Sequence, residues 1–261
     1  MDDIVTEHAG SILRVQLNRP TRRNAMTSAM YLALAGIFNE AANDEDTRVV
    51  VWHGVGDSFC AGNDIEDFLK NPPGAGESPQ ADLMNELVNF DKPLVAAVQG
   101  AAIGGGTTML THCDFIYAGE STKFQMPFIN LALVPEFGSS CSVPARIGHV
   151  RAAELILLGG PFDARRAAEF GLVTEVVSDK DFLARATETA RKLAAKPAAA
   201  LQASKRLMKQ PFREQIKAAM KAENEEFSIQ VRSADAKEAL TAFLEKRKPD
   251  FTRPTKSPAT A

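Results

Sequence analysis

Apolar and polar residues follow different periods along this chain. The stretches 4–8 and 11–17 alternate between apolar and polar positions on either side of a glycine, which predicts a β-hairpin. Two later segments, 48–52 and 94–98, are apolar at nearly every position. Strands that are buried on both faces of a parallel sheet have this composition. The pattern therefore predicts an α/β fold built around a parallel sheet.

In much of the remaining chain, apolar residues recur with the spacing of an α-helix. Thr27 or Ser28 can cap a helix that runs to about residue 42, in which apolar residues recur every three or four positions. Further helices are expected at 64–69, 81–90, 106–112, 141–147, 150–158 and 164–170, and further extended segments at 114–118, 123–127 and 172–177. Beyond Ser178 we expect helices to about Lys246. Breaks are expected at Lys196-Pro197 and Gln210-Pro211, because proline lacks the backbone donor that a helix needs.

Two segments are expected to lack regular structure. Residues 70–80 are rich in proline and glycine and predict a mobile surface loop. Residues 249–261 are rich in proline, threonine and serine and predict a tail that frays.

Composition excludes several kinds of partner. The 261 residues carry a formal net charge of −3, which gives no electrostatic attraction to nucleic acid or to a membrane surface. No apolar run reaches transmembrane length, and the N-terminus lacks the apolar segment of a secretory signal. Cys60, Cys113 and Cys141 have no CxxC spacing. We therefore expect a cytoplasmic protein in a reducing compartment, with no metal site and no nucleic acid or membrane partner.

A glycine turn follows the first buried strand, in the sequence Asp57-Ser-Phe-Cys-Ala-Gly-Asn-Asp-Ile65. The chain turns at Gly62, and Asp64 can cap the short helix expected next. A strand that breaks into a helix leaves backbone N–H groups free, and such groups bind developing negative charge. An ordinary strand-to-helix turn needs the same glycine, so this turn alone does not decide between the two interpretations.

A second glycine turn, Gly100-Ala-Ala-Ile-Gly-Gly-Gly106, follows the next buried strand. It admits three interpretations: a dinucleotide-binding fingerprint, an oxyanion site, or a helix packed too closely for side chains. The first is weak, because the turn lies far from the N-terminus and neither Tyr31 nor Tyr117 has a lysine four residues on, as a short-chain dehydrogenase requires. Three glycines cost a helix start about 1 kcal/mol each relative to alanine, which favours function and close packing about equally.

Two such turns in this order and separation resemble those of the crotonase (enoyl-CoA hydratase/isomerase) superfamily. The similarity extends over nearly the whole chain, through the motifs Asn18-Arg-Pro, Asn24-Ala-Met26, Phe59-Cys-Ala-Gly-Asn-Asp-Ile65, Lys92-Pro-Leu-Val-Ala-Ala-Val-Gln-Gly-Ala-Ala-Ile-Gly-Gly-Gly106, Phe170-Gly-Leu-Val173 and Phe243-Leu-Glu-Lys-Arg-Lys248. The resemblance implies a crotonase/ClpP-like spiral of ββα repeats and a C-terminal helical trimerisation region. Residues 1–196 would form the spiral core with the active site. Residues 197–261 would form the helical region that builds a homotrimer or hexamer, with a flexible tail.

The resemblance also implies a site. Its oxyanion hole would be formed by the backbone N–H groups of Asn63 and Gly105, which hold the thioester oxygen of an acyl-CoA. Coenzyme A is then part of the substrate, and no separate cofactor is expected. Other contacts to the substrate or to coenzyme A are implied for Ala61, Gly62, Asp64, Ile65 and Arg22, and, reaching the coenzyme A of a neighbouring subunit, for Phe243 and Lys246.

Carboxylates distinguish the members of this superfamily. Hydratases that this chain resembles carry two glutamates, and the corresponding positions here are Thr108 and Phe128. Hydration of a double bond needs a group that activates water and a proton donor, so a two-glutamate hydratase mechanism is disfavoured. One acid remains nearby, Glu136, in the sequence Leu133-Val-Pro-Glu-Phe-Gly-Ser-Ser140. This pattern is similar to that of peroxisomal-type Δ3,Δ2-enoyl-CoA isomerases, in which a single glutamate is the catalytic base.

The sequence therefore predicts an enzyme of fatty acid metabolism that converts 3-enoyl-CoA to trans-2-enoyl-CoA through a thioester enolate. Glu136 would remove a proton from C2 and return it at C4. Apolar neighbours such as Phe128 and Phe137 would raise its pKa. A hydratase-like enzyme with an atypical acid or base, and a non-catalytic acyl-CoA-binding protein, remain alternatives.

The other candidate side chains favour structural roles. Cys60 has no evident histidine partner, so we interpret it as a small buried residue rather than a nucleophile. His53 and His112 are interpreted as core or helix-end residues. Ser139 or Ser140 is expected to cap the helix that follows.

Overall fold

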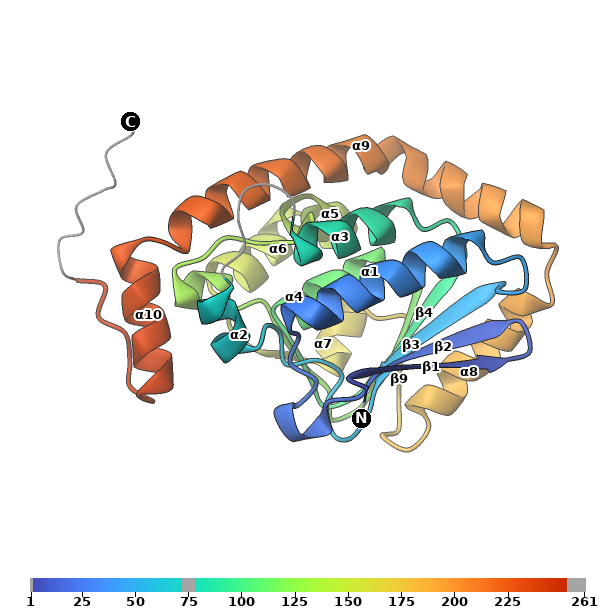
Figure 1. Cartoon of the computed structure of the whole chain (residues 1–261), viewed down its shortest axis with the longest axis horizontal. Helices are drawn as coiled ribbons and strands as arrows, with labels where there is room; N and C mark the ends of the chain where they lie inside the picture. Colours follow the sequence, from blue (N-terminus) through green and yellow to red (C-terminus); the bar gives the residue numbers. More distant parts are fainter. Residues whose placement is uncertain (1, 72–77, 253–261) are drawn as a thin grey trace.

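A six-stranded sheet forms the centre of the molecule (Figure 1). The computed structural model describes residues 2–71 and 78–252. The strand order is β1-β2-β3-β4-β6-β9, and the strands are β1 (Ile4–Ala9), β2 (Ile12–Leu17), β3 (Val49–Gly54), β4 (Leu94–Val98), β6 (Phe115–Gly119) and β9 (Glu175–Val177). β1 and β2 pair antiparallel as the predicted hairpin, and the other neighbouring strands pair parallel. The predicted α/β class with a parallel sheet is confirmed.

β3 and β4 are apolar throughout because both of their faces are covered. Val50 and Trp52 contribute to one hydrophobic core, and Val49 and Val51 contribute to another on the opposite face. Helices α1 (Ser28–Asn43) and α3 (Pro79–Asn89) supply side chains to the first core, and α8 (Phe182–Ala194) supplies side chains to the second. Because helices cover both faces of the sheet, apolar side chains are buried on either side of these strands, and apolar and polar residues do not alternate along them.

A second, smaller sheet carries the second glycine turn. Its order is β5-β7-β8, with β5 (Ala101–Ile103), β7 (Lys123–Gln125) and β8 (Phe162–Asp163). The sequence pattern predicted extended backbone at β7 but no strand at β5 or β8. Strands of two or three residues are too short for a period of two to be recognised.

The other helices follow the predicted order along the chain. Their bounds are α2 (Ile65–Lys70), α4 (Gly105–Thr108), α5 (Ser139–Ile147), α6 (His149–Leu157), α7 (Ala164–Glu169), α9 (Ala198–Gln230) and α10 (Ala234–Leu244), with 3-10 segments η1 (Pro20–Arg22), η2 (Met109–His112) and η3 (Phe128–Leu131). The helix predicted at 106–112 is thus one α-helical turn followed by a 3-10 segment. The strand predicted at 172–177 begins only at Glu175, because the N–H groups of Leu172 and Val173 donate to Ala167 at the end of α7.

α9 continues through Pro211, so the predicted break at this position is wrong. A proline inside a helix removes one backbone hydrogen bond, and contacts on both sides of it hold the helix in place. Lys209 donates to the carbonyl oxygen of Leu87 at 3.0 Å, and Arg213 pairs with Asp91 at 2.6 Å. The long helix therefore arches past α3 as one piece (Figure 1). The other predicted break, before Ala198, is confirmed.

Two sequence predictions concern residues outside the described part. The predicted mobile loop falls largely on residues 72–77, and the predicted fraying tail falls largely on residues 253–261. Within 2–71 and 78–252, no helix has the length and apolar character needed to cross a membrane. α9 and α10 make the described chain beyond residue 197 mostly helical, and the role of this region in oligomerisation stays a prediction.

Candidate active site

The two glycine turns lie side by side, although they are far apart in the sequence. Cys60 in the first turn forms a parallel β-bridge with Ala102 in β5. The Cys60 N–H donates to the Ala101 carbonyl at 3.0 Å, and the Ile103 N–H donates to the Cys60 carbonyl at 2.9 Å. A Cβ at Gly106 would collide with the Cys60 carbonyl oxygen, so glycine is required for this approach. Close packing and an oxyanion site are therefore not exclusive interpretations of these glycines.

The first turn leaves the backbone N–H of Asn63 free. Met26 donates its N–H to the Gly62 carbonyl and accepts from the Asp64 N–H, both at 2.8 Å. In this parallel bridge the hydrogen bonds are made by the backbone groups of Gly62 and Asp64, on either side of Asn63. The N–H of Asn63 itself makes none of them.

The second turn leaves the backbone N–H of Gly105 free. The preceding Gly104 donates its N–H to the Gln125 carbonyl at 2.9 Å, and Gly105 is the first residue of α4, where a helical N–H has no partner in the helix. In the part of the chain that the structure describes, neither Asn63 N–H nor Gly105 N–H has a hydrogen-bond partner, and both residues line one cavity. Two free donors at one cavity can stabilise negative charge on an oxygen.

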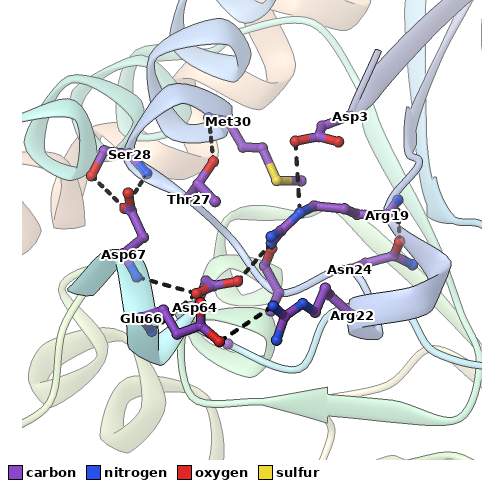
Figure 2. A network of polar contacts seen from close by, with 12 residues as sticks. Asp3, Arg19, Arg22, Asn24, Thr27, Ser28, Met30, Asp64, Glu66 and Asp67 are labelled. Atoms are coloured by element: carbon purple, nitrogen blue, oxygen red, sulfur yellow. Dashed lines mark hydrogen bonds and ion pairs between the residues drawn. The ribbon is translucent and has the colours of Figure 1, made fainter. Parts of the chain in front are cut away.

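A network of polar contacts holds the end of the first turn at Asp64 (Figure 2). Arg19 pairs with the Asp64 carboxylate at 2.9 Å, and Asp64 accepts from the N–H groups of Glu66 and Asp67 at 3.0 and 3.2 Å. Burial acts to raise the pKa of Asp64, but the hydrogen bond from Asp67, together with Arg19, lowers it below its ordinary value. Asp64 is thus an ionised N-cap of α2, as its sequence position predicted.

Two further side chains tie this turn to the start of α1. Asp67 accepts from both the N–H and the hydroxyl of Ser28 at 2.8 Å (Figure 2). Asn24 accepts from the Arg19 N–H at 2.8 Å and donates to the Ser58 carbonyl at 2.7 Å. The first glycine turn and the segment before α1 are therefore one hydrogen-bonded unit that holds Asn63.

A cavity of about 350 Å³ opens beside the two free N–H groups. Seven of the residues selected from the sequence line it: Ala61, Gly62, Asn63, Ile65, Gly105, Glu136 and Phe243. Most of the other wall residues are apolar, among them Phe68, Phe128, Leu131, Leu133, Phe227 and Leu240. The volume and lining suit a mostly apolar ligand group with one polar end.

Glu136 is the acidic side chain of this cavity wall among the described residues. It is 5% exposed, and its Oε1 has no hydrogen-bond partner. A Cβ at Gly105 would lie 3.0 Å from this Oε1, which places the carboxyl group against the second glycine turn. Burial, and to a lesser extent the charge of Glu223, raises the pKa of Glu136 to about 8. A carboxyl group with this pKa can both accept and return a proton near neutral pH.

Glu223 of α9 holds the backbone just after Glu136. Its carboxylate accepts from the N–H groups of Gly138 and Ser140, each at 2.7 Å, at the start of α5. The prediction that Ser139 or Ser140 caps α5 is therefore wrong, because neither side chain makes a capping hydrogen bond and an acid from a distant helix takes that place.

His112 fixes the same segment from the other side. Phe137 has a φ of +61°, a conformation that costs a residue with a side chain about 1 kcal/mol or more. The His112 Nε2 lies 2.8 Å from the Phe137 carbonyl oxygen and donates to it, because a carbonyl can only accept. Burial lowers the pKa of His112 to about 3, so the ring is neutral. His112 is a buried structural residue, as predicted, and it helps to position Glu136.

Tyr31 of α1 connects the two sides of the cavity, and the sequence pattern did not mark it as a site residue. Its hydroxyl donates to the Asn63 Oδ1 at 2.7 Å and would lie 3.1 Å from a Cβ at Gly105. Burial, followed by the charge of Glu136, raises the pKa of Tyr31 well above its ordinary value, so the phenol stays protonated. Tyr31 lies on the buried face of a helix. At such a position the sequence pattern is the same for a residue that only packs in the core and for one that belongs to a site.

Three selected residues lie outside the cavity wall. Asp64 is occupied with Arg19 and α2, and Arg22 pairs with Glu66 at 3.3 Å on the surface. Lys246 follows α10 and is not part of the wall. Phe243, which was expected to reach a neighbouring subunit, lies at the cavity of its own chain, and the nearby Arg247, which the sequence analysis did not select, joins it there.

Cys60 and His53 have structural positions. Cys60 is fully buried, and burial raises the pKa of its thiol to about 12, which leaves no nucleophilic thiolate near neutral pH. His53 is buried in β3, and burial lowers its pKa. Both agree with the roles expected from the sequence.

The fold, the paired glycine turns and the apolar cavity with one buried acid define a class of acyl-thioester enzymes. The profile of the family "Enoyl-CoA hydratase/isomerase" matches residues 7–254, and the chain belongs to this family. It is similar to a crystal structure of an enoyl-CoA hydratase/isomerase from Pseudoalteromonas atlantica T6c, with 36% identity and a TM-score of 0.91 over 96% of this chain and 100% of the other. The expected crotonase fold is thus confirmed.

Relatives of known name have different activities. The 1,2-epoxyphenylacetyl-CoA isomerase of Escherichia coli is 32% identical over 97% of this chain and 99% of its own. The enoyl-CoA hydratase EchA19 of Mycobacterium tuberculosis is 35% identical over 95% of this chain and 96% of its own. The rat enoyl-CoA delta isomerase 2 is 32% identical over 94% of this chain and 64% of its own. Because isomerases and hydratases match at similar identity, the reaction has to be argued from the site.

Proposed function

We propose that this protein is a Δ3,Δ2-enoyl-CoA isomerase in which Glu136 is the only catalytic acid–base group. The observation that carries the proposal is the position of Glu136: its carboxyl group is buried in the wall that also contains the free N–H groups of Asn63 and Gly105. An isomerase needs one base beside an oxyanion site, and this cavity offers that combination.

The reaction follows from these three groups. The thioester oxygen of a 3-enoyl-CoA accepts from the N–H groups of Asn63 and Gly105. The ionised Glu136 removes a proton from C2, the C3=C4 double bond moves to C2=C3 through the dienolate, and Glu136 returns the proton at C4. Each N–H is worth about 2.7–4 kcal/mol to the enolate by comparison with other oxyanion holes. Atoms and charge balance with no further reactant.

The positions that carry glutamate in hydratases support isomerisation over hydration. The Thr108 hydroxyl is buried and bonds to the Gly104 carbonyl at 3.3 Å. Phe128 contributes an apolar ring to the cavity wall. Neither residue can activate water as a carboxylate does.

Substrate binding completes the proposal. Coenzyme A is part of the substrate, so no separate cofactor is required, and the bulk of the acyl chain would lie along Ile65 and the aromatic wall. Arg22 and Lys246 are the cations that the resemblance assigns to coenzyme A, and binding of its phosphates by them stays a prediction. The described cysteines are free, which suits a reducing compartment such as the cytoplasm.

One comparison tests the reaction. The purified protein is given matched 3-enoyl-CoA and trans-2-enoyl-CoA substrates, and products are followed by mass spectrometry in deuterated water. The proposal predicts rapid conversion of the 3-enoyl substrate with exchange of α-protons, and little addition of water to the 2-enoyl substrate. Dominant hydration would instead identify a hydratase. Binding without exchange would identify a non-catalytic acyl-CoA-binding protein.

A further inference from the structure

A second, smaller cavity adjoins the main one beside Glu136. Its volume is about 20 Å³, enough for one water-sized group. It shares Asn63, Glu136 and Phe227 with the wall of the main cavity. Its remaining wall residues are Ser78, Gln80, Met84 and Asn224. Four of these seven side chains carry an amide or a hydroxyl group, in contrast to the mostly apolar main cavity.

Two of the amides have no hydrogen-bond partner within the described residues. Gln80 of α3 is only 8% exposed, and Asn224 of α9 is half-buried. The amide atoms of both residues remain accessible at this wall, so they can form hydrogen bonds with whatever occupies the space between the two helices.

Tyr31 holds a third amide of this wall, the side chain of Asn63. Its hydroxyl donates to the Asn63 Oδ1 at 2.7 Å, which fixes the oxygen on the Tyr31 side and turns the Nδ2 group away from it. Asn63 is part of both cavity walls. The backbone of Asn63 therefore faces the thioester, and its side chain is available for a different part of the ligand.

The charge of the small cavity limits what it can hold. Among the described residues of its wall there is no lysine, arginine or histidine, and there is one acid, Glu136. An anionic group would be repelled, and an alkyl group would leave the amides unpaired. A neutral group that donates or accepts hydrogen bonds satisfies them.

We propose that this cavity is a subsite for a neutral hydroxyl or carbonyl substituent on the acyl chain of the substrate. The preferred substrate is then an acyl-CoA whose chain carries such a group a few carbons beyond the reacting double bond. This inference rests on the proposed function, because it assumes that the acyl chain lies beside Glu136. Sites that bind a substrate hydroxyl discriminate strongly against analogues that lack it, because their own polar groups are then left unpaired.

The experiment compares two substrates of equal chain length, 3-hexenoyl-CoA and its 6-hydroxy derivative. We expect the wild-type protein to have the higher kcat/KM on the hydroxylated substrate. Gln80→Met and Asn224→Leu remove the amides at similar volume, and each should lower the ratio of the two kcat/KM values by about three- to tenfold. Asn85→Leu, on the exposed side of the same helix as Gln80, is the matched control and should leave the ratio unchanged.

Two results would overturn the subsite. One is a wild-type preference for the alkyl substrate. The other is an equal loss on both substrates in the variants, which would mean that the cavity holds a structural water only. Calorimetry with hexanoyl-CoA and 6-hydroxyhexanoyl-CoA separates this proposal from the proposed reaction. A binding preference for the hydroxyl that the variants lose, in a protein that isomerises neither substrate, would keep the subsite and reject the isomerase.

Discussion

At the scale of single residues, the environment of Glu136 is the feature that matters most. Its Oε1 is buried without a hydrogen-bond partner, and burial of the carboxyl group raises its pKa to about 8. The charge of Glu223 adds to this effect. A group that must be ionised to remove a proton and protonated to return it works best when its pKa is near the working pH.

The first prediction concerns the pH dependence of turnover. Since the free enzyme needs ionised Glu136, kcat/KM for a 3-enoyl-CoA should rise with pH and level off above about 8. Glu223→Gln removes the neighbouring negative charge and should move the midpoint to lower pH. Glu214→Gln, at an exposed position of α9, is the control and should leave the midpoint where it is. A midpoint below pH 6, or one insensitive to Glu223, would contradict this account.

The second prediction concerns stability. The ordinary pKa of 4.5 applies to Glu136 in the unfolded chain, and folding raises it to about 8. The folded state therefore binds more protons between these values, and this contribution to the free energy of unfolding is lost as the pH rises from 4.5 to 8. Glu136→Gln should remove the loss. Its melting temperature relative to wild type should be higher at pH 8 than at pH 5, and equal differences at both pH values would argue against a buried acid.

The residue scale also shows what could not be predicted. Glu136 was selected because its position in a motif is distinctive, and the structure places it in the cavity wall. Tyr31 and Glu223 were missed because each lies in a helix whose pattern is explained by core packing or by exposure. Gln80 was missed because the sequence analysis placed it in the loop 70–80, whereas α3 begins at Pro79. Their roles depend on contacts between segments far apart in the chain.

At the scale of elements, the site depends on the contact between the first glycine turn and β5. The bridge from Cys60 to Ala102 brings together two turns that each leave one N–H free. Sequence patterns predicted both turns but not their contact, because a bridge of this length has no periodicity of its own. The same limit explains why β5 and β8 were missed.

The third prediction belongs to this contact. A Cβ at Gly106 would collide with the Cys60 carbonyl oxygen and lie 2.9 Å from its Cβ. Gly106→Ala should therefore cost about 1–3 kcal/mol of stability and should lower kcat as well, because the neighbouring Gly105 N–H moves. Gly36→Ala is the matched control: its site is exposed within α1 and open around the new Cβ, so about 0.5–1 kcal/mol should be gained. Denaturant unfolding and steady-state kinetics measure both effects, and an active, fully stable Gly106→Ala would refute the tight contact.

At the scale of the whole molecule, α9 joins parts that are distant in the sequence. Lys205 pairs with Asp114 next to β6 at 2.7 Å, and Glu223 caps α5 beside Glu136. The helical nature of this region was predicted from its composition. Its continuity through Pro211 was not, because the compensating contacts come from Leu87 in α3 and from Asp91 between α3 and β4, which are far away in the sequence.

The fourth prediction concerns assembly. The outward side of α9 exposes Leu207, Met208 and Phe212, which are 66%, 75% and 48% exposed. Apolar side chains gathered on one helix face indicate a contact surface, and we expect this surface to build a trimer.

Light scattering should give three times the 28.2 kDa of one chain, or twice that value for a hexamer. A Met208→Glu, Phe212→Glu double variant should give a smaller species, whereas Leu32→Glu, at an exposed position of α1, should not. A monomeric wild-type protein would contradict this expectation.

The central claim is that one buried acid moves the proton while two backbone N–H groups hold the thioester oxygen. The most direct test is the turnover of 3-enoyl-CoA by Glu136→Gln, with the affinity for a saturated acyl-CoA measured on the same preparation. The account predicts a loss of kcat of about 10²–10⁴-fold with an affinity within a few fold of wild type. Turnover near the wild-type rate would contradict it.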